Sequence, residues 1–252
     1  MTPTLTTFLI VCPLVFLAGF VDAIGGGGGL ISLPAYIIAG LPVHLAVGTN
    51  KLANGCGTAL ATAQFLRKGL VNMRLGVITI VFALIGSGLG ANLSLLADES
   101  MLKVILLPVL IIAAFFVMNK KLFGRPGSDT VTLDRRTVIT AGIAAFVIGI
   151  YDGFYGPGTG TFLIIALNVF ARLDLKRANA QTKVINLTTN VTSFAVFLIH
   201  GQILWSVGLA AAVCNMAGNY IGANLAIRQG ERITRPIILI MLAALAVKIL
   251  MG

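Results

Sequence analysis

Charged residues are scarce in this chain. Only 10% of its 252 residues are Asp, Glu, Lys or Arg, whereas an ordinary soluble domain carries about 25%. Hydrophobic residues make up 58% of the sequence, and the mean hydropathy is +0.99. A chain of this composition has too few polar side chains to cover a water-exposed surface. We therefore exclude a soluble domain and expect an all-α protein that crosses a membrane several times.

Acidic residues are the scarcest of the charged ones, with 8 Asp and Glu against 18 Lys and Arg, for a net charge of +10. The basic residues lie mainly in short loops between apolar runs, as in the cytoplasmic loops of membrane proteins. This distribution argues against nucleic-acid binding. We expect the lipid bilayer and a small anionic substrate as partners, and nothing in the sequence indicates an oligomer.

Residues that bind metals and cofactors are also few. Cys12, Cys56 and Cys214 have neither metal-ligand nor disulfide spacing, and the two histidines, His44 and His200, lie at expected loop ends. The glycine-rich runs match neither a phosphate-binding loop nor a dinucleotide fingerprint. We therefore predict no metal and no cofactor.

The two halves of the chain resemble each other. Lys51 and Lys183 lie 132 positions apart, and Gly-Ala-Asn-Leu at 90–93 recurs at 222–225 with the same offset. Nearer the start of each half the offset is 130. Agreement of this extent indicates a duplication.

Each half contains five apolar segments. They are expected at residues 7–24, 28–40, 45–66, 74–97 and 101–118, and at 137–155, 158–171, 178–200, 203–227 and 234–251. We therefore divide the chain into a first membrane repeat (1–118), a linker (119–136) and a second membrane repeat (137–252). Segments 28–40 and 158–171 are too short to cross a bilayer easily, so we expect half-helices or tight returns there.

Matched loops of the two halves carry opposite charge. The loop after residue 66 is basic, whereas its counterpart at 200–205 has no Lys or Arg. Conversely, loop 41–44 has no Lys or Arg, whereas its counterpart at 172–177 has three such residues. Because basic loops stay in the cytoplasm, we expect inverted repeats with the 119–136 linker in the cytoplasm.

A glycine-rich run precedes each short segment, at 25–29 and at 156–160. Such runs interrupt helices, and Pro157 reinforces the second break. Unwound backbone and the following helix N-terminus offer N–H groups to an oxyanion, so we name Gly26, Gly28, Gly156 and Gly158 as binding residues. A tight turn or close helix packing would use the same glycines.

Lys51 and Lys183 each lie inside a long apolar segment, where a lysine costs roughly 2.5–3.5 kcal/mol on insertion scales. We expect the two lysines to neutralise one anion together. The alternatives are that each reaches a membrane surface or neutralises a buried aspartate. Polar neighbours on the same segments complete the predicted site: Thr49, Asn50 and Asn54 in the first half, and Gln181, Thr182, Asn186 and Asn190 in the second.

Asp22 and Asp152 stand just ahead of the two breaks. A carboxylate at membrane depth is often kept for proton coupling. It could equally cap the broken helix or pair with an intramembrane lysine. The sequence leaves these roles open.

The paired motifs resemble those of a known family. Asp22-Ala-Ile-Gly-Gly-Gly-Gly-Gly followed by Leu33-Pro34, Gly-Thr-Asn-Lys at 48–51, and Asp-Gly-Phe-Tyr-Gly-Pro-Gly-Thr-Gly at 152–160 are similar to motifs of the TauE/SafE family of sulfite and organosulfonate exporters. The resemblance covers nearly the whole chain. It implies a transporter of the bacterial inner membrane for small sulfur-containing anions.

We therefore predict a secondary transporter that exports sulfite or an organosulfonate by alternating access, with proton coupling as one role of the aspartates. A passive anion channel could use the same site. An intramembrane enzyme is the other alternative, but the sequence offers no nucleophile–base pair or metal set at depth.

Overall fold

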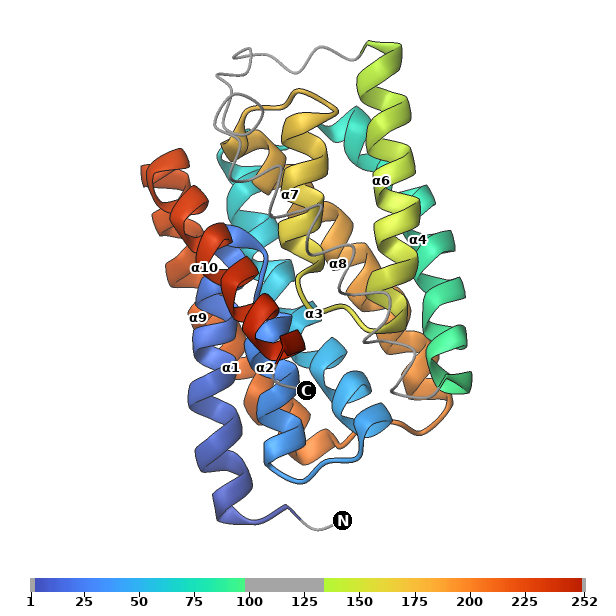
Figure 1. The fold of residues 1–252 in the computed structure, drawn as a ribbon, viewed down its shortest axis with the longest axis vertical. Coiled ribbons are helices and arrows are strands. Elements are labelled where there is room, and N and C mark those ends of the chain that lie inside the picture. Colours follow the sequence, from blue (N-terminus) through green and yellow to red (C-terminus); the bar gives the residue numbers. More distant parts are fainter. Residues whose placement is uncertain (1–2, 98–133, 251–252) are drawn as a thin grey trace.

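The computed structural model describes residues 3–97 and 134–250, and within them the regular structure is entirely helical (Figure 1). The expected segment 101–118 and most of the linker lie outside the described residues. The helices are α1 (Leu5–Gly25), α2 (Gly29–Ile38), α3 (Val43–Arg67), α4 (Met73–Leu96), α6 (Arg135–Phe154), α7 (Thr159–Val169), α8 (Leu175–Ile199), α9 (Trp205–Gln229) and α10 (Glu231–Leu250).

Several helices begin at a polar side chain that satisfies their first N–H groups. Asn72 accepts from Leu75 at the start of α4, and Asp174 accepts from two N–H groups at the start of α8. Asp134 accepts from Thr137 at the start of α6, and these hydrogen bonds hold the pKa of its carboxyl below the usual value. The caps explain why these helices begin where their apolar runs do.

Four of the described helices are long and apolar enough to span a membrane, namely α1, α4, α6 and α8. The outer face of α4 is apolar, with exposed Val77, Val81, Leu84 and Leu89 among its residues. In a soluble protein such a face would need a partner, whereas lipid covers it in a bilayer. The all-α membrane architecture expected from composition is confirmed.

The helices α2 and α7 are short, with 10 and 11 residues. At 1.5 Å per residue each covers about 15 Å, roughly half of a hydrocarbon core. Each follows a helix break, which is a short non-helical stretch at a glycine-rich run. Gly26 ends α1 in the left-handed region with φ 76°, and Gly158 precedes α7 with φ 83°. The expected interruption at both glycine runs is therefore present.

The helices pack in pairs drawn from opposite halves. The first helix of each half, α1 or α6, packs along the fourth helix of the other, α9 or α4. Similarly, α3 packs on α9 and α8 packs on α4. In Figure 1, α1 rises from the N-terminus at the bottom, whereas its counterpart α6 descends from the top. Exchanging each helix with its counterpart thus reproduces the pattern of contacts.

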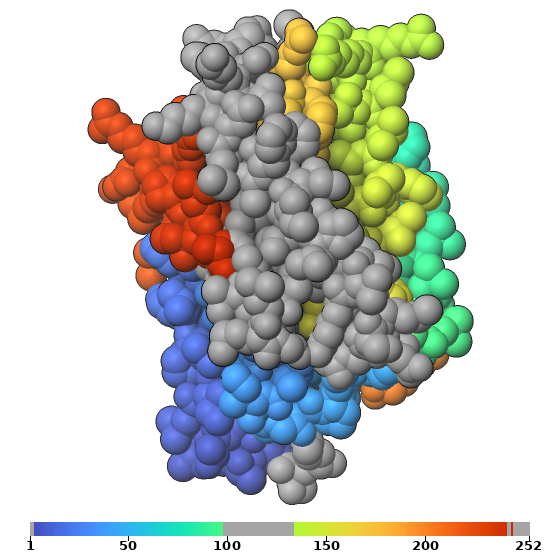
Figure 2. Space-filling view, in the orientation of Figure 1, coloured from blue at the N-terminus to red at the C-terminus, as the bar shows by residue number. Residues whose placement is uncertain are grey.

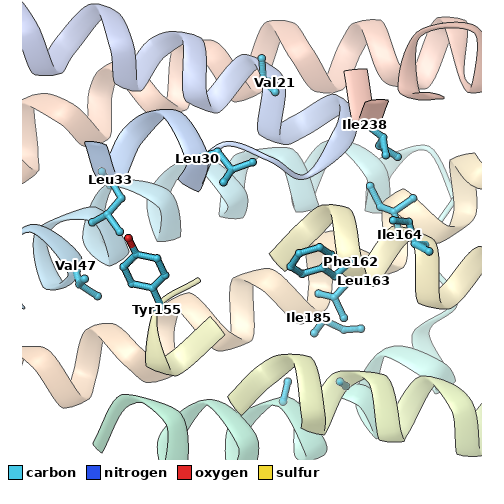
Figure 3. Packing of buried hydrophobic residues seen from close by; sticks show 14 of the residues in the cluster. Val21, Leu30, Leu33, Val47, Tyr155, Phe162, Leu163, Ile164, Ile185 and Ile238 are labelled. Carbon is cyan, nitrogen blue, oxygen red and sulfur yellow. The ribbon is translucent and has the colours of Figure 1, made fainter. Parts of the chain in front are cut away.

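The buried apolar residues fill the space between these pairs. Figure 2 shows α1 and α10 along one side of the molecule and α4 and α6 along the other. Figure 3 shows Tyr155, from the second break, pointing toward Leu33 of α2, while Phe162 and Leu163 of α7 lie near Ile185 of α8. Both short helices are thus held by a continuous core, in which Leu33, Leu163 and Ile185 are almost fully buried.

Candidate functional site

Two ion pairs, one buried and one partly buried, connect the halves of the molecule. The Nζ of Lys51 on α3 lies 3.0 Å from a carboxylate oxygen of Asp152 on α6. The Nζ of Lys183 on α8 lies 3.0 Å from a carboxylate oxygen of Asp22 on α1. Each lysine thus pairs with the aspartate of the other half. Of the roles left open by the sequence, the structure shows pairing between lysine and aspartate.

Each lysine also donates to the main chain at a helix break. Lys51 Nζ donates to the Asp152 carbonyl at 2.6 Å, and Lys183 Nζ donates to the Asp22 carbonyl. These carbonyls belong to the last turns of α6 and α1, and the Asp22 carbonyl also accepts from the Gly26 N–H at 2.8 Å. The lysines therefore offset the negative ends of both broken helices as well as the carboxylates.

The two breaks touch each other at the centre of the molecule. Thr161 on α7 donates from its N–H to the Gly26 carbonyl at 3.2 Å, and from its hydroxyl to the Gly25 carbonyl at 2.7 Å. A Cβ added at Gly26 would lie 2.2 Å from the main chain of Gly160. Only glycine permits this approach, because no side chain fits between the two backbones.

A pocket of about 350 Å³, part of it open to solvent, lies where the breaks and the ion pairs meet. Nine of its lining residues are predicted site or coupling residues. The lining is Asp22, Gly26, Gly29, Asn50, Lys51, Asn54, Thr58, Asp152, Tyr155, Gly156, Thr159, Gly160, Asn186 and Asn190. Residues from both halves of the sequence therefore share one polar space.

The first turns of both short helices contribute to the lining of this pocket. Gly29 and Gly160 lie in the first turns of α2 and α7 and line the pocket. Among the described residues, neither main-chain N–H has a hydrogen-bond acceptor, and neither helix start has a side-chain cap. Two helix N-termini with unused N–H groups suit an oxyanion.

Six predicted site residues do not line the pocket in this structure. The Thr49 hydroxyl accepts from the Leu204 N–H at 3.0 Å, at the start of α9. Gln181 donates to the Thr79 hydroxyl at 3.4 Å. The others are Gly28 and Gly158 at the starts of α2 and α7, Thr182, whose hydroxyl is buried, and Lys183, whose Nζ pairs with Asp22.

Five lining residues were not among the predicted site residues. Gly29, Thr159 and Gly160 belong to the same two glycine-rich runs as the predicted glycines. The sequence therefore indicated the correct runs but not every residue in them. Thr58 follows Lys51 by seven positions, a spacing that places it on the same polar helix face as Lys51 and Asn54. Tyr155 reaches the pocket through the fold of the second break, which no spacing specifies.

The groups that line the pocket suit the binding of a small charged ligand. Within residues 3–97 and 134–250 there is no cluster of His, Cys, Asp and Glu that could hold a metal ion. The pocket instead offers one ammonium group, two carboxylates, several side-chain amides and unused N–H groups. Such a set can hold a small charged ligand by hydrogen bonds and charge.

Comparison with known proteins finds relatives along nearly the whole chain. The profile of the family "Sulfite exporter TauE/SafE" matches residues 11–249. A "Probable membrane transporter protein" of Haemophilus influenzae is 38% identical over 90% of this chain and 88% of its own length. The "Probable membrane transporter protein ORF9" of a Sinorhizobium species is 36% identical over 98% of this chain and 92% of its own.

A third relative is the "Probable membrane transporter protein YfcA" of Escherichia coli K12, 33% identical over 93% of this chain and 86% of its own length. No solved structure matches the chain. The relatives' names indicate a membrane transporter, and the apolar helices indicate a multi-pass membrane protein. With a profile match over nearly its full length, the chain belongs to the TauE/SafE sulfite exporter family.

Proposed function

We propose that this protein is a secondary transporter that exports a small sulfur-containing oxyanion, sulfite or an organosulfonate, across the bacterial inner membrane. The pocket between the two helix breaks is the binding site. The observation that carries this proposal is the convergence of Lys51 with the unused N–H groups of Gly29 and Gly160 on one small space. Family membership supports the substrate class, and family resemblance supports the direction and the membrane.

The charges around the pocket suggest how a proton takes part. Two lysines and two aspartates sum to zero, so an arriving anion meets no net positive charge. If Asp152 takes up a proton, Lys51 loses its counter-charge and can pair with the anion instead. Coulomb attraction is strong in so buried a place, because little water screens it. We therefore propose that the anion and a proton bind together.

Unpaired acceptors in the pocket fit this proposal. The Oδ1 atoms of Asn50 and Asn186 are buried, and neither has a donor among the described residues. A protonated carboxyl or a protonated ligand would supply one. Buried acceptors of this kind are costly when they stay unpaired.

The duplication supports alternating access. In this structure Lys51 lines the pocket, whereas Lys183 pairs with Asp22 and is not among the lining residues. We propose that the repeats are inverted in the membrane and that their roles exchange when the protein opens to the other side. Lys183 would then face the substrate, and both lysines would serve one anion in turn. The exchanged helix contacts support this symmetry.

Flux through proteoliposomes tests the proposal. We expect the purified protein to transport sulfite or an organosulfonate, and to do so faster down an imposed pH gradient than without one. Asp152→Asn should bind the anion but transport it independently of the gradient. A quaternary ammonium cation serves as the control solute and should not be transported.

Gradient-independent flux of the natural protein would instead indicate the passive channel. Absence of any anion flux or anion binding by the folded protein would contradict the proposal altogether.

A further inference from the structure

A chain of side-chain amides on α9 and α3 leads to the pocket. Asn219 and Asn215 on α9 are each 1% exposed, and Asn54 on α3 lines the pocket. Asn219 Nδ2 donates to Asn215 Oδ1 at 2.7 Å, and Asn215 Nδ2 donates to Asn54 Oδ1 at 2.9 Å. The three amides form one continuous hydrogen-bonded row that ends at the candidate site.

Main-chain carbonyls fix the direction of this row. A side-chain amide can be turned over, so its orientation follows from its partners. Asn219 Nδ2 also meets the Asn215 carbonyl at 3.2 Å, and Asn215 Nδ2 also meets the Val15 carbonyl at 3.5 Å. Carbonyl oxygens only accept, so both amides must present their NH₂ groups at these places.

The direction determines what Asn54 offers to a ligand. Because Asn215 donates to Asn54 Oδ1, that oxygen is occupied and the NH₂ group of Asn54 remains. No hydrogen bond from Asn54 Nδ2 to another described residue is found. Turning Asn54 over would place its NH₂ against the NH₂ of Asn215 and lose the bond. Asn54 is therefore held as a donor.

The other half of the molecule lacks this device. Asn186 is the counterpart of Asn54, and the position matching Asn215 is Ala83. The Oδ1 of Asn186 has no donor in the described part of the chain, so nothing comparable fixes its amide. The two halves thus present differently constrained amides to the same pocket.

We propose that Asn215 is a positioning residue for anion selection. It holds Asn54 with its NH₂ group toward the pocket, and Asn219 holds Asn215 in turn. This favours ligands that accept hydrogen bonds, such as sulfur oxyanions, over cations and hydrogen-bond donors. The inference rests on the proposed function, because it concerns the same pocket.

A double-mutant cycle tests it, with sulfite and an organosulfonate as probes of the purified protein. Asn215→Leu should weaken anion binding about tenfold, the scale of one hydrogen bond to a charged group. Asn54→Leu should weaken it by at least as much. With Asn54→Leu present, adding Asn215→Leu should change affinity less than twofold, because Asn215 acts through Asn54.

Two further variants keep the test decisive. Ser87→Ala removes a buried contact between α4 and α8 that does not line the pocket, and its anion affinity should equal that of the natural protein. Asn219→Ala should weaken binding several-fold and carries the test if Asn215→Leu does not fold. It is also expected to lose its effect when Asn54→Leu is present.

The outcomes separate the two proposals. If the natural protein binds anions and the effects of Asn215→Leu and Asn54→Leu simply add, Asn215 does not act through Asn54 and the inference is wrong. Unchanged affinity in Asn215→Leu or Asn219→Ala would also overturn it. If the natural, folded protein binds no anion, the proposed function itself fails.

Discussion

At the scale of single residues, the crossed ion pairs bear on the stability of the fold, because their charges lie where little water can solvate them. Lys51 and Asp152 have side chains only 3% and 6% exposed. Removing one partner of a buried pair leaves the other charge without compensation, which typically costs about 3–5 kcal/mol. Removing both can be nearly neutral, because no charge remains to be solvated.

We predict that losing one partner of the pair destabilises the protein more than losing both. Lys51→Met should lower the thermal unfolding temperature in detergent markedly, because it strands the Asp152 carboxylate. The combination of Lys51→Met with Asp152→Asn should recover most of the loss. If the combined variant is no more stable than Lys51→Met alone, the pair does not hold the halves together.

Residue spacing predicted which charges matter but not how they pair. The sequence placed Lys51 and Lys183 at matched positions and offered pairing with aspartates as one alternative. The pairing partners lie 101 and 161 positions apart, so no local pattern links them. The crossed arrangement depends on packing α1 and α6 against the opposite half.

At the scale of elements, the glycine runs allow two broken helices to touch. Gly26 and Gly69 both adopt positive φ, at 76° and 65°. They differ in surroundings, since a Cβ at Gly26 would meet Gly160 at 2.2 Å, whereas a Cβ at Gly69 would meet nothing within 4 Å. The chain thus offers a matched pair of substitutions.

Gly69→Ala should cost about 1–2 kcal/mol, because the left-handed backbone disfavours a Cβ. Gly26→Ala should cost about 1–3 kcal/mol more, because the added atom also overpacks the contact between the breaks. Urea unfolding in mild detergent measures both. If both variants lose the same free energy of unfolding, the backbones of the two helix breaks are not in the close contact described here.

The starts of the two short helices followed closely from the sequence. Segments 28–40 and 158–171 correspond to α2 and α7, because glycine and proline mark their starts so strongly. The far ends were less well predicted. Asn168 donates to the Leu173 carbonyl beyond α7, a side-chain contact that hydrophobic patterning does not reveal. Segment 101–118 lies outside the described residues and stays a prediction.

At the scale of the whole molecule, the charge of the loops and the direction of the helices agree. In Figure 1 the end of α3 and the starts of α4, α6 and α8 lie toward the top, and the end of α8 lies toward the bottom. The upper group includes the basic residues Arg67, Arg74, Arg135 and Arg177. An inverted repeat with these ends in the cytoplasm remains our prediction for the membrane.

Single-cysteine labelling of intact cells tests that topology, after replacement of the three natural cysteines. Arg67→Cys and Arg232→Cys should react with a membrane-impermeant maleimide only after the cells are opened. His200→Cys should react from outside. Labelling of Arg67→Cys and His200→Cys from the same side would rule out the inverted arrangement.

Anion affinity measured by calorimetry on purified protein tests most directly whether the pocket beside Lys51 binds the substrate. The natural protein should bind sulfite or an organosulfonate, more tightly at lower pH because a proton binds with the anion. The combination of Lys51→Met and Asp152→Asn should bind at least about tenfold more weakly, whereas Lys68→Met, at the exposed end of α3, should bind normally. Unchanged affinity in the combined variant would show that the anion binds elsewhere and that the lysine is only a counter-charge.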